Sequence, residues 1–223
     1  MQEKVIVSWS GGKDSTLALQ EILQANRYKV AGFLTTVNRD FNRISIHGVQ
    51  SVLLEQQANS LGFPLKKMFV PKDVDNVEYE DSLLRILRKN RNNGISSVVF
   101  GDIFLEDVRK YRERILSKSG LKSVFPLWGR NTGELAQSFV DRGFKAIVTV
   151  VDLNFLDRKF AGREFDRVFL SDLPESVDPC GENGEFHSFV YDGPIFRKKV
   201  AFAAGEVALR ENQFYYCDLV PIE

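Results

Sequence analysis

The sequence predicts an α/β fold, in which a doubly wound parallel sheet is followed by a smaller C-terminal α+β domain. Three observations lead to this prediction. Short β-branched runs alternate with helical stretches through the first 125 residues, a glycine-rich turn joins the first strand to the first helix, and the pattern changes beyond residue 126. Ligands bind such sheets at the carboxyl ends of the strands, so we expect the functional residues there.

The periodicity of the first half predicts its elements one by one. We expect strands over residues 5–9, 28–37, 65–70, 98–100 and 123–125. We expect helices between them, over residues 16–23, 49–61, 79–92 and 105–117. Gly62 and Gly94 follow two of these helices, which is typical of helix C-termini.

A domain boundary is predicted where Phe125 meets the turn-like run Pro126-Leu127-Trp128-Gly129. We therefore expect one domain over residues 1–125 and a second over 126–223. For the second we expect a helix over 132–142, a strand over 144–151, a partly helical stretch over 157–173, a loop over 174–184 and a hairpin formed by 198–209 and 214–220.

The run Ser10-Gly11-Gly12-Lys13-Asp14-Ser15 is typical of a phosphate-binding loop. Its glycines let backbone N–H groups turn toward an anion, and the positive end of the following helix dipole lies at the same place. Lys13 would add a mobile cation, and the two serines would add hydroxyl groups. The alternative is a glycine-rich turn in which Asp14 or Ser15 only caps the helix.

The spacing of this run excludes two common nucleotide motifs. A Walker A loop has a glycine, four residues and then Gly-Lys-Ser/Thr, whereas here Gly12-Lys13 is followed by Asp14. The run also lacks the Gly-x-Gly-x-x-Gly spacing of dinucleotide-binding folds. It resembles instead the pyrophosphate loop, Ser-Gly-Gly-x-Asp-Ser, of ATP pyrophosphatases, which activate a carboxylate or amide by adenylation.

Composition narrows the class of protein further. The 223 residues include 30 basic and 30 acidic side chains, for a formal net charge of zero, which gives no indication of a nucleic-acid or membrane surface. Cys180 and Cys217 are the two cysteines and have no zinc-site spacing. With no signal-peptide pattern and no apolar run long enough to span a bilayer, we expect a cytoplasmic protein.

A second candidate site is the segment from residue 180 to residue 189, which concentrates acids, glycines and a histidine. Glu182 and Glu185 could hold an ammonium ion and accept a proton as an amine attacks, while His187 could orient a carbonyl group or act as a general base. The alternative is a polar loop whose carboxylates are simply solvated.

Two weaker signals lie elsewhere in the chain. His47 follows the second predicted strand and could belong to a substrate loop, although a lone histidine is more often merely exposed. Arg85, Arg88, Lys89 and Arg91 could touch RNA phosphates, but their confinement to one helix favours a solvated face, so we expect no nucleic-acid partner.

Taken together, these segments make the chain resemble the diphthine–ammonia ligase family of ATP pyrophosphatases. The matching motifs span nearly the whole chain and are Ser10–Ser15, Ile46-His47-Gly48, Phe100-Gly101-Asp102-Ile103, Phe125–Trp128 and Cys180–His187. The last of these motifs best distinguishes this family from other adenylating enzymes, and its sequence is most similar to that of the bacterial branch. Diphthamide itself belongs to archaea and eukaryotes, so membership of that branch would imply a different carboxylate acceptor.

The resemblance implies a fold of the adenine nucleotide alpha hydrolase type and an AMP-forming amide ligase. ATP, Mg²⁺ and ammonia would be required, together with a carboxylate-bearing acceptor that is either a small molecule or a protein side chain. An oligomer is possible. The nucleotide-binding residues would be Ser10, Gly11, Gly12, Lys13, Asp14, Ser15, Thr35, Gly101 and Asp102. Asp14 would hold the metal, the catalytic residues would be Lys13, Asp14, Glu185 and His187, and the substrate-binding residues would be His47, Glu182, Glu185 and His187.

Two other functions remain open at this point. One is a tRNA-modifying enzyme that activates a base for sulfur transfer, which usually requires cysteine pairs and an RNA-binding surface. The other is a regulator that binds ATP without turning it over.

Overall fold

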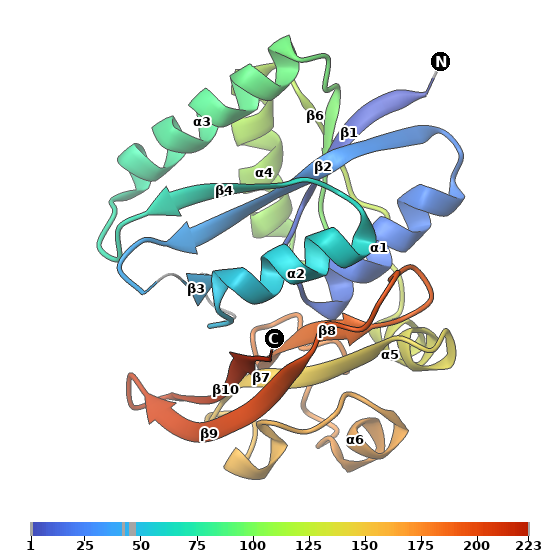
Figure 1. Ribbon diagram of the computed structural model, residues 1–223, viewed down its shortest axis with the longest axis vertical. Helices are drawn as coiled ribbons and strands as arrows, with labels where there is room; N and C mark the ends of the chain where they lie inside the picture. Colours follow the sequence, from blue (N-terminus) through green and yellow to red (C-terminus); the bar gives the residue numbers. More distant parts are fainter. Residues whose placement is uncertain (1, 42, 45–47, 223) are drawn as a thin grey trace.

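The structure is a computed structural model that describes residues 2–41, 43–44 and 48–222 (Figure 1). A six-stranded sheet forms its N-terminal half. The parallel strands run in the order β4-β2-β1-β5-β6, with bounds Leu65–Val70, Tyr28–Asn38, Glu3–Ser8, Ser97–Val99 and Lys122–Val124. The short β3 (Arg43–Ile44) pairs antiparallel with the end of β2. This order confirms the doubly wound α/β prediction and places the topological switch point between β1 and β5.

Helices cover both faces of this sheet. Apolar side chains of α1 (Lys13–Gln24) and α2 (Ser51–Leu61) pack with Val5 and Val7 of β1 on one face. Those of α3 (Asn76–Asn92) and α4 (Glu106–Ser119) pack with Ile6 and Val98 on the other. Successive side chains of a strand point to opposite faces, so the continuous apolar runs of β1 and β5 supply both cores.

A four-stranded antiparallel sheet forms the C-terminal half. Its order is β8-β7-β10-β9, with bounds Phe186–Asp192, Lys145–Asp152, Phe214–Pro221 and Phe202–Arg210. The remaining elements are α5 (Thr132–Asp141), η1 (Arg158–Phe160) and α6 (Arg167–Asp172). Figure 1 shows α1 and α2 between the two sheets, with α6 on the far side of the second and α5 beside its end.

A buried glutamine joins the two sheets. Gln57 of α2 is fully buried, and its Oε1 accepts a hydrogen bond from Trp9 Nε1 at 2.6 Å. Its Nε2 donates to the carbonyls of Gly11, at 3.0 Å, and of Val190, at 2.6 Å. One amide therefore fixes the end of β1, the glycine-rich turn and strand β8 relative to one another. The Trp9 ring is also stacked on Phe33, with centroids 4.3 Å apart.

The sequence missed two strands. The predicted loop ended at residue 184 and no strand was predicted between it and the hairpin, yet residues 186–192 form β8, an edge strand whose backbone pairs with β7. Strand β8 lacks a clear alternation of apolar and polar residues, because both of its faces are mostly buried. The two-residue β3 is too short to leave a periodic signal.

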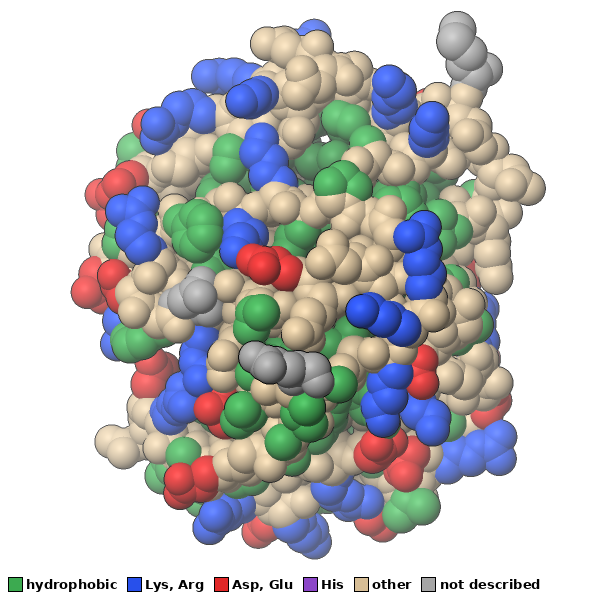
Figure 2. All heavy atoms as spheres, in the orientation of Figure 1, with side chains coloured by type: hydrophobic (Ala, Val, Ile, Leu, Met, Phe, Trp, Pro, Cys, Tyr) green, Lys and Arg blue, Asp and Glu red, His purple; other side chains and the backbone are tan. Residues whose placement is uncertain are grey.

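Charges of both signs are mixed over the surface (Figure 2). Basic side chains gather at the upper left, over α3, where Arg85, Arg88, Lys89 and Arg91 are exposed. Acidic side chains lie close by at the left edge. In the part of the chain that the structure describes, no helix combines the length and the hydropathy needed to cross a bilayer.

We expect Gln57→Leu to lower the free energy of unfolding by about 3 kcal/mol. The substitution preserves much of the volume but takes the Gln57 amide from the buried Trp9 N–H and Val190 carbonyl, at about 1–3 kcal/mol for each unsatisfied group, whereas the Gly11 carbonyl keeps the Val190 N–H. Urea denaturation measures the change. Gln56→Leu, at the partly exposed neighbouring position, is the control. An equal effect of the two substitutions would contradict the role assigned to Gln57.

Candidate functional site

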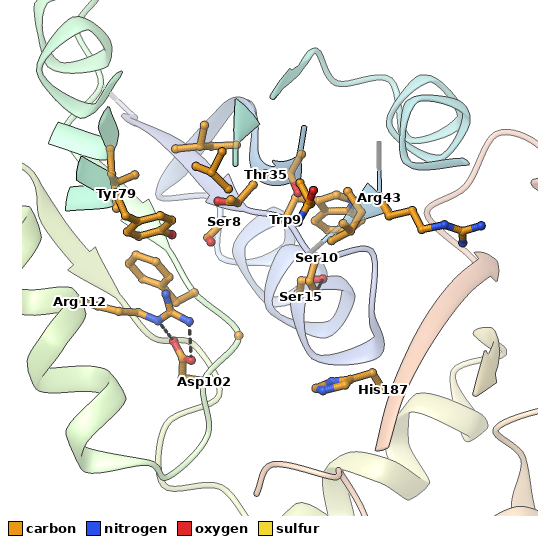
Figure 3. A pocket seen from close by; sticks show the side chains of 18 of the residues that line it. Ser8, Trp9, Ser10, Ser15, Thr35, Arg43, Tyr79, Asp102, Arg112 and His187 are labelled. Carbon is orange, nitrogen blue, oxygen red and sulfur yellow. Dashed lines mark hydrogen bonds and ion pairs between the residues drawn. The ribbon is translucent and has the colours of Figure 1, made fainter. Parts of the chain in front are cut away.

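A cavity of about 1020 Å³ opens at the carboxyl ends of β1, β2 and β5. It lies at the switch point of the sheet, where doubly wound folds bind their ligands. The sequence-predicted residues that line it are Ser10, Asp14, Ser15, Thr35, Gly101, Asp102, Glu182 and His187. Figure 3 shows Ser10, Ser15 and Thr35 around the centre of this space, with His187 below them.

The glycine-rich turn enters α1 in the way a phosphate loop requires. Gly11 has φ of +80°, and a Cβ there would lie 3.0 Å from Gln57 Oε1, so conformation and space both favour glycine. Gly12 is the N-cap of α1 and supplies no side-chain hydrogen bond. The hydroxyls of Ser10 and Ser15 lie 3.2 Å apart at the edge of the cavity. This helix N-terminus is therefore suited to an anion.

Lys13 does not take the position that we expected for it. We expected a mobile cation directed at a phosphate, but the side chain is 2% exposed and is absent from the cavity wall. Its ammonium donates to the carbonyl of Cys180 and, at 2.9 Å, to Asp14 Oδ2, and it lies over the Phe186 ring. Lys13 therefore connects the phosphate loop to the C-terminal half of the protein.

Asp14 is the carboxylate best placed to hold a metal ion. It lines the cavity, Lys13 occupies its Oδ2, and its Oδ1 is buried without a hydrogen-bond partner among the described residues. Burial raises the pKa of the Asp14 carboxyl, and the Lys13 ammonium offsets part of that effect. Burial also opposes the charged form of Lys13, but the Asp14 carboxylate outweighs it and the pKa of the ammonium is raised.

This arrangement fits a magnesium ion. The described residues contain no group of three or more His, Cys, Asp or Glu side chains arranged as an all-protein metal site. Mg²⁺ usually binds to one or two carboxylates together with substrate phosphates, and the buried, unpartnered Oδ1 of Asp14 offers such a ligand.

Gly101 and Asp102 close the second side of the cavity. A Cβ on Gly101 would lie 2.8 Å from the backbone carbon of Asp14 and 2.8 Å from the nitrogen of Ser15, so the end of β5 abuts the phosphate loop. Asp102 accepts hydrogen bonds from Arg112 Nε at 2.6 Å and Nη2 at 3.0 Å. No role was predicted for Arg112 from the sequence, because its partner lies ten residues away across a loop.

Two carboxylates shape the segment 178–188, which we call the acceptor segment. Asp178 Oδ2 accepts from the backbone N–H groups of Cys180, at 3.2 Å, and Glu182, at 2.9 Å. Glu185 is 1% exposed and accepts from the N–H groups of Asp178, at 3.1 Å, and Asn183, at 3.0 Å. Glu185 therefore stabilises the segment from within and does not reach the cavity. The catalytic and substrate-binding roles predicted for it stay predictions that this position does not favour.

Glu182 is the acidic side chain of this segment that faces the cavity. Its Oε1 accepts from the backbone N–H of Ile103 at 2.7 Å, and no hydrogen bond to its Oε2 is found among the described residues. Burial raises the pKa of Glu182 to about 7, with the Ile103 N–H opposing this and the Asp14 carboxylate adding to it. A carboxyl group with such a pKa can accept or release a proton near neutrality.

Of the two histidines predicted to bind substrate, the structure describes one. His187 lies in β8, lines the cavity and is half-buried. His47 lies outside the described residues, so its predicted role in substrate binding stays a prediction.

The acceptor segment and the phosphate loop meet in the structure, although more than 160 positions separate them in sequence. Besides the Lys13–Cys180 contact, the backbone N–H of Lys13 donates to Ser188 Oγ at 3.3 Å. Gly181 lines the same cavity as Asp14. Asp178 was not predicted to have a role. An aspartate before Pro-Cys-Gly is nevertheless a known signal for a turn stabilised by side-chain hydrogen bonds.

The strand order and the loop at the switch point define the class. This is a doubly wound α/β protein with a glycine-rich phosphate loop of the Ser-Gly-Gly-x-Asp-Ser type, completed by a C-terminal antiparallel sheet. Comparison with known families makes the assignment more specific. The model of the diphthamide synthase N-terminal domain matches residues 3–123, and that of the C-terminal domain matches residues 131–219. The chain belongs to the diphthamide synthase family.

Curated relatives share this family. A diphthine–ammonia ligase of Bos taurus is 25% identical over 89% of this chain and 82% of the relative. That of Homo sapiens is 24% identical, over 90% and 83% respectively. That of Schizosaccharomyces pombe is 27% identical over 92% of this chain but only 37% of its own length.

We expect Gly101→Ala to lower the free energy of unfolding by about 1–3 kcal/mol and to weaken ATP binding. The new methyl group would press on the backbone of Asp14 and Ser15, and such overpacking costs about this amount. Thermal denaturation with and without ATP measures both effects. Gly133→Ala, where a Cβ would meet only Asn131 Oδ1 at 3.2 Å, is the matched control. Unchanged ATP stabilisation in Gly101→Ala would contradict the prediction.

Proposed function

We propose that this protein is an ATP-dependent amide ligase that adenylates a substrate carboxylate and then transfers ammonia to it. One observation carries the proposal: the phosphate loop and the acceptor segment line a single cavity. An acyl group that must react first with ATP and then with ammonia requires both partners in one place. The family supports the same reading, because its curated relatives are named diphthine–ammonia ligases.

The nucleotide side of the cavity is formed by the N-terminal half. In the proposed reaction the backbone of Gly11–Ser15 and the hydroxyls of Ser10 and Ser15 bind phosphate oxygens at the N-terminus of α1. Thr35 and Gly101 line the space beside them. Asp14 would hold Mg²⁺ through Oδ1, and the ion would neutralise charge on the phosphates.

In the first step, an oxygen of the acceptor carboxylate bonds to the α-phosphorus of ATP and the bond to the β-phosphate oxygen breaks. The products are an acyl-adenylate and pyrophosphate. Preorganised donors of the phosphate loop stabilise the negative charge on the leaving group, which is commonly the largest catalytic contribution.

In the second step, ammonia bonds to the acyl carbon and the bond from that carbon to the AMP oxygen breaks. The attacking nitrogen must lose a proton. We assign that proton to Glu182, because its carboxyl group faces the cavity and its pKa of about 7 allows it to accept one near neutral pH. His187, at the floor of the cavity, would orient the acyl carbonyl.

Diphthine is the first acceptor to test, because the relatives are named for it. We also propose that the chain belongs to the bacterial-type branch that its motifs resemble. In that branch another carboxylate, on a small molecule or a protein side chain, would take the place of diphthine. We place the reaction in the cytoplasm, with residues 1–125 carrying the nucleotide and 126–223 the acceptor.

The reaction is tested by incubating the protein with ATP, Mg²⁺, ammonium and candidate acceptors. We expect AMP and pyrophosphate, formed in proportion to the amide. ADP as the main product would contradict adenylation, and ATP binding without any turnover in the presence of the true acceptor would favour a regulator. Sulfur transfer to tRNA is less well supported, because Cys180 is buried and burial raises the pKa of its thiol.

We expect Glu182→Gln to reduce amide formation by about 10²–10⁴-fold, the usual contribution of a general base, while ATP–pyrophosphate exchange continues. Glu185→Gln is the matched comparison, since it makes the same chemical change three residues away on a side chain that does not line the cavity. Its effect should be a loss of stability, visible as a lower Tm. A selective loss of amination in Glu185→Gln but not in Glu182→Gln would reverse this assignment.

The pH dependence gives a separate prediction. A base must be deprotonated to act, and the raised pKa keeps much of Glu182 protonated below pH 7. The rate of amide formation at a fixed concentration of free ammonia should therefore rise as the pH increases through about 7. Glu182→Gln should lose this rise. A variant that keeps the full pH profile of the wild type would exclude Glu182 as the base.

A further inference from the structure

We propose that Arg112, and not Lys13, is the cation that contacts the phosphates of the bound nucleotide. The inference rests on the proposed function in one respect, that ATP occupies the cavity. It concerns a residue that no sequence motif indicated, and it changes which positive charge interacts with the reactants.

The first step of the argument is the position of Lys13. Its ammonium is enclosed by Asp14, the Cys180 carbonyl and the rings of Phe165 and Phe186, at 5.8 and 5.2 Å from their centroids. A side chain that is 2% exposed and already paired cannot reach an anion in the cavity without breaking these contacts. The phosphate loop thus presents backbone amides and hydroxyls, but no free ammonium.

The second step is the position of Arg112. Its guanidinium lines the cavity on the side opposite the phosphate loop, as Figure 3 shows for Arg112 and Asp102 facing Ser10 and Ser15. Its partner Asp102 directly follows Gly101, where an added Cβ would lie 2.8 Å from the backbone carbon of Asp14 and 2.8 Å from the nitrogen of Ser15, so the chain that holds the Asp102–Arg112 pair adjoins the phosphate loop at the end of β5.

The third step is that Arg112 is already oriented. Nε and Nη2 donate to Asp102, and the guanidinium is stacked over the Phe100 ring at 4.5 Å. No hydrogen bond from Nη1 to a described residue is found, so this edge remains for a ligand. An arginine held in this way binds a phosphate with little further loss of side-chain freedom.

The other cations of the cavity wall are less suited. Arg43 uses both terminal nitrogens on Asp218, at 2.7 and 3.2 Å, and Figure 3 shows its guanidinium directed away from the centre. Lys72 and Arg210 lie over the rings of Phe41 and Tyr216, respectively, on segments that form other parts of the wall. Arg112 is therefore the cation that faces the phosphate loop.

The experiment compares the binding of ATP and adenosine by calorimetry in EDTA, where Asp14 cannot act through a metal ion. We expect Arg112→Gln to weaken ATP binding by about 10–100-fold, the usual range for charge-assisted hydrogen bonds, with adenosine binding unchanged. Arg109→Gln is the matched control on the same helix, because Arg109 pairs with Glu113 and does not line the cavity.

A second pair of variants covers the case in which Asp102, left unpaired, prevents folding. Asp102→Asn alone should keep the preference for ATP over adenosine, and Asp102→Asn combined with Arg112→Gln should lose it by the same 10–100-fold factor. Retention of the preference in both variants that lack Arg112 would overturn the proposal. Wild-type protein that binds no ATP would overturn the proposed function and this assignment with it, so the two failures are distinguishable.

Discussion

The amide of Gln57 is the interaction on which the site depends. It bonds to Trp9 at the end of β1, to Gly11 in the phosphate loop and to Val190 in β8, and all of these contacts are buried. Buried amide groups lose free energy when they lack a partner, so the three segments must keep one arrangement. Because α2 lies between the two sheets, this side chain bonds to the loop and to the C-terminal half at once, and it acts together with the bond from the Val190 N–H to the Gly11 carbonyl.

The electrostatics of the cavity follow from that arrangement. Three carboxylates face one space, and each is stabilised differently: Asp14 by the Lys13 ammonium, Asp102 by the Arg112 guanidinium, and Glu182 by the backbone N–H of Ile103. Of the three, Glu182 is the one without an ion-pair partner among the described residues, and its pKa is raised to about 7. A carboxyl group with a pKa near neutrality is suited to exchanging a proton, which distinguishes Glu182 as the candidate base of this cavity.

The sequence predicts well what depends on local periodicity and poorly what depends on tertiary partners. The parallel strands, their helices and the glycine-rich loop follow from patterns a few residues long, and β4 and the C-terminal hairpin fall close to their expected ranges. The direction of Lys13 does not, because it is decided by the carbonyl of Cys180, a contact 167 residues away. The choice between Glu182 and Glu185 also escapes sequence reasoning. Between them stands Gly184 with φ of +93°, so spacing alone cannot show which carboxylate turns inward.

These contacts also explain why the N-terminal half would not form the site alone. Without the acceptor segment, the Lys13 ammonium would lose the Cys180 carbonyl and its cover by Phe165 and Phe186, and its backbone N–H would lose Ser188 Oγ. Lys13 would then be free to turn toward solvent, and Asp14 would lose the partner that holds its Oδ2. The geometry of the nucleotide side is thus set in part by the acceptor side. In an enzyme built in this way, the phosphate loop reaches its final geometry only when the acceptor segment is in place beside it.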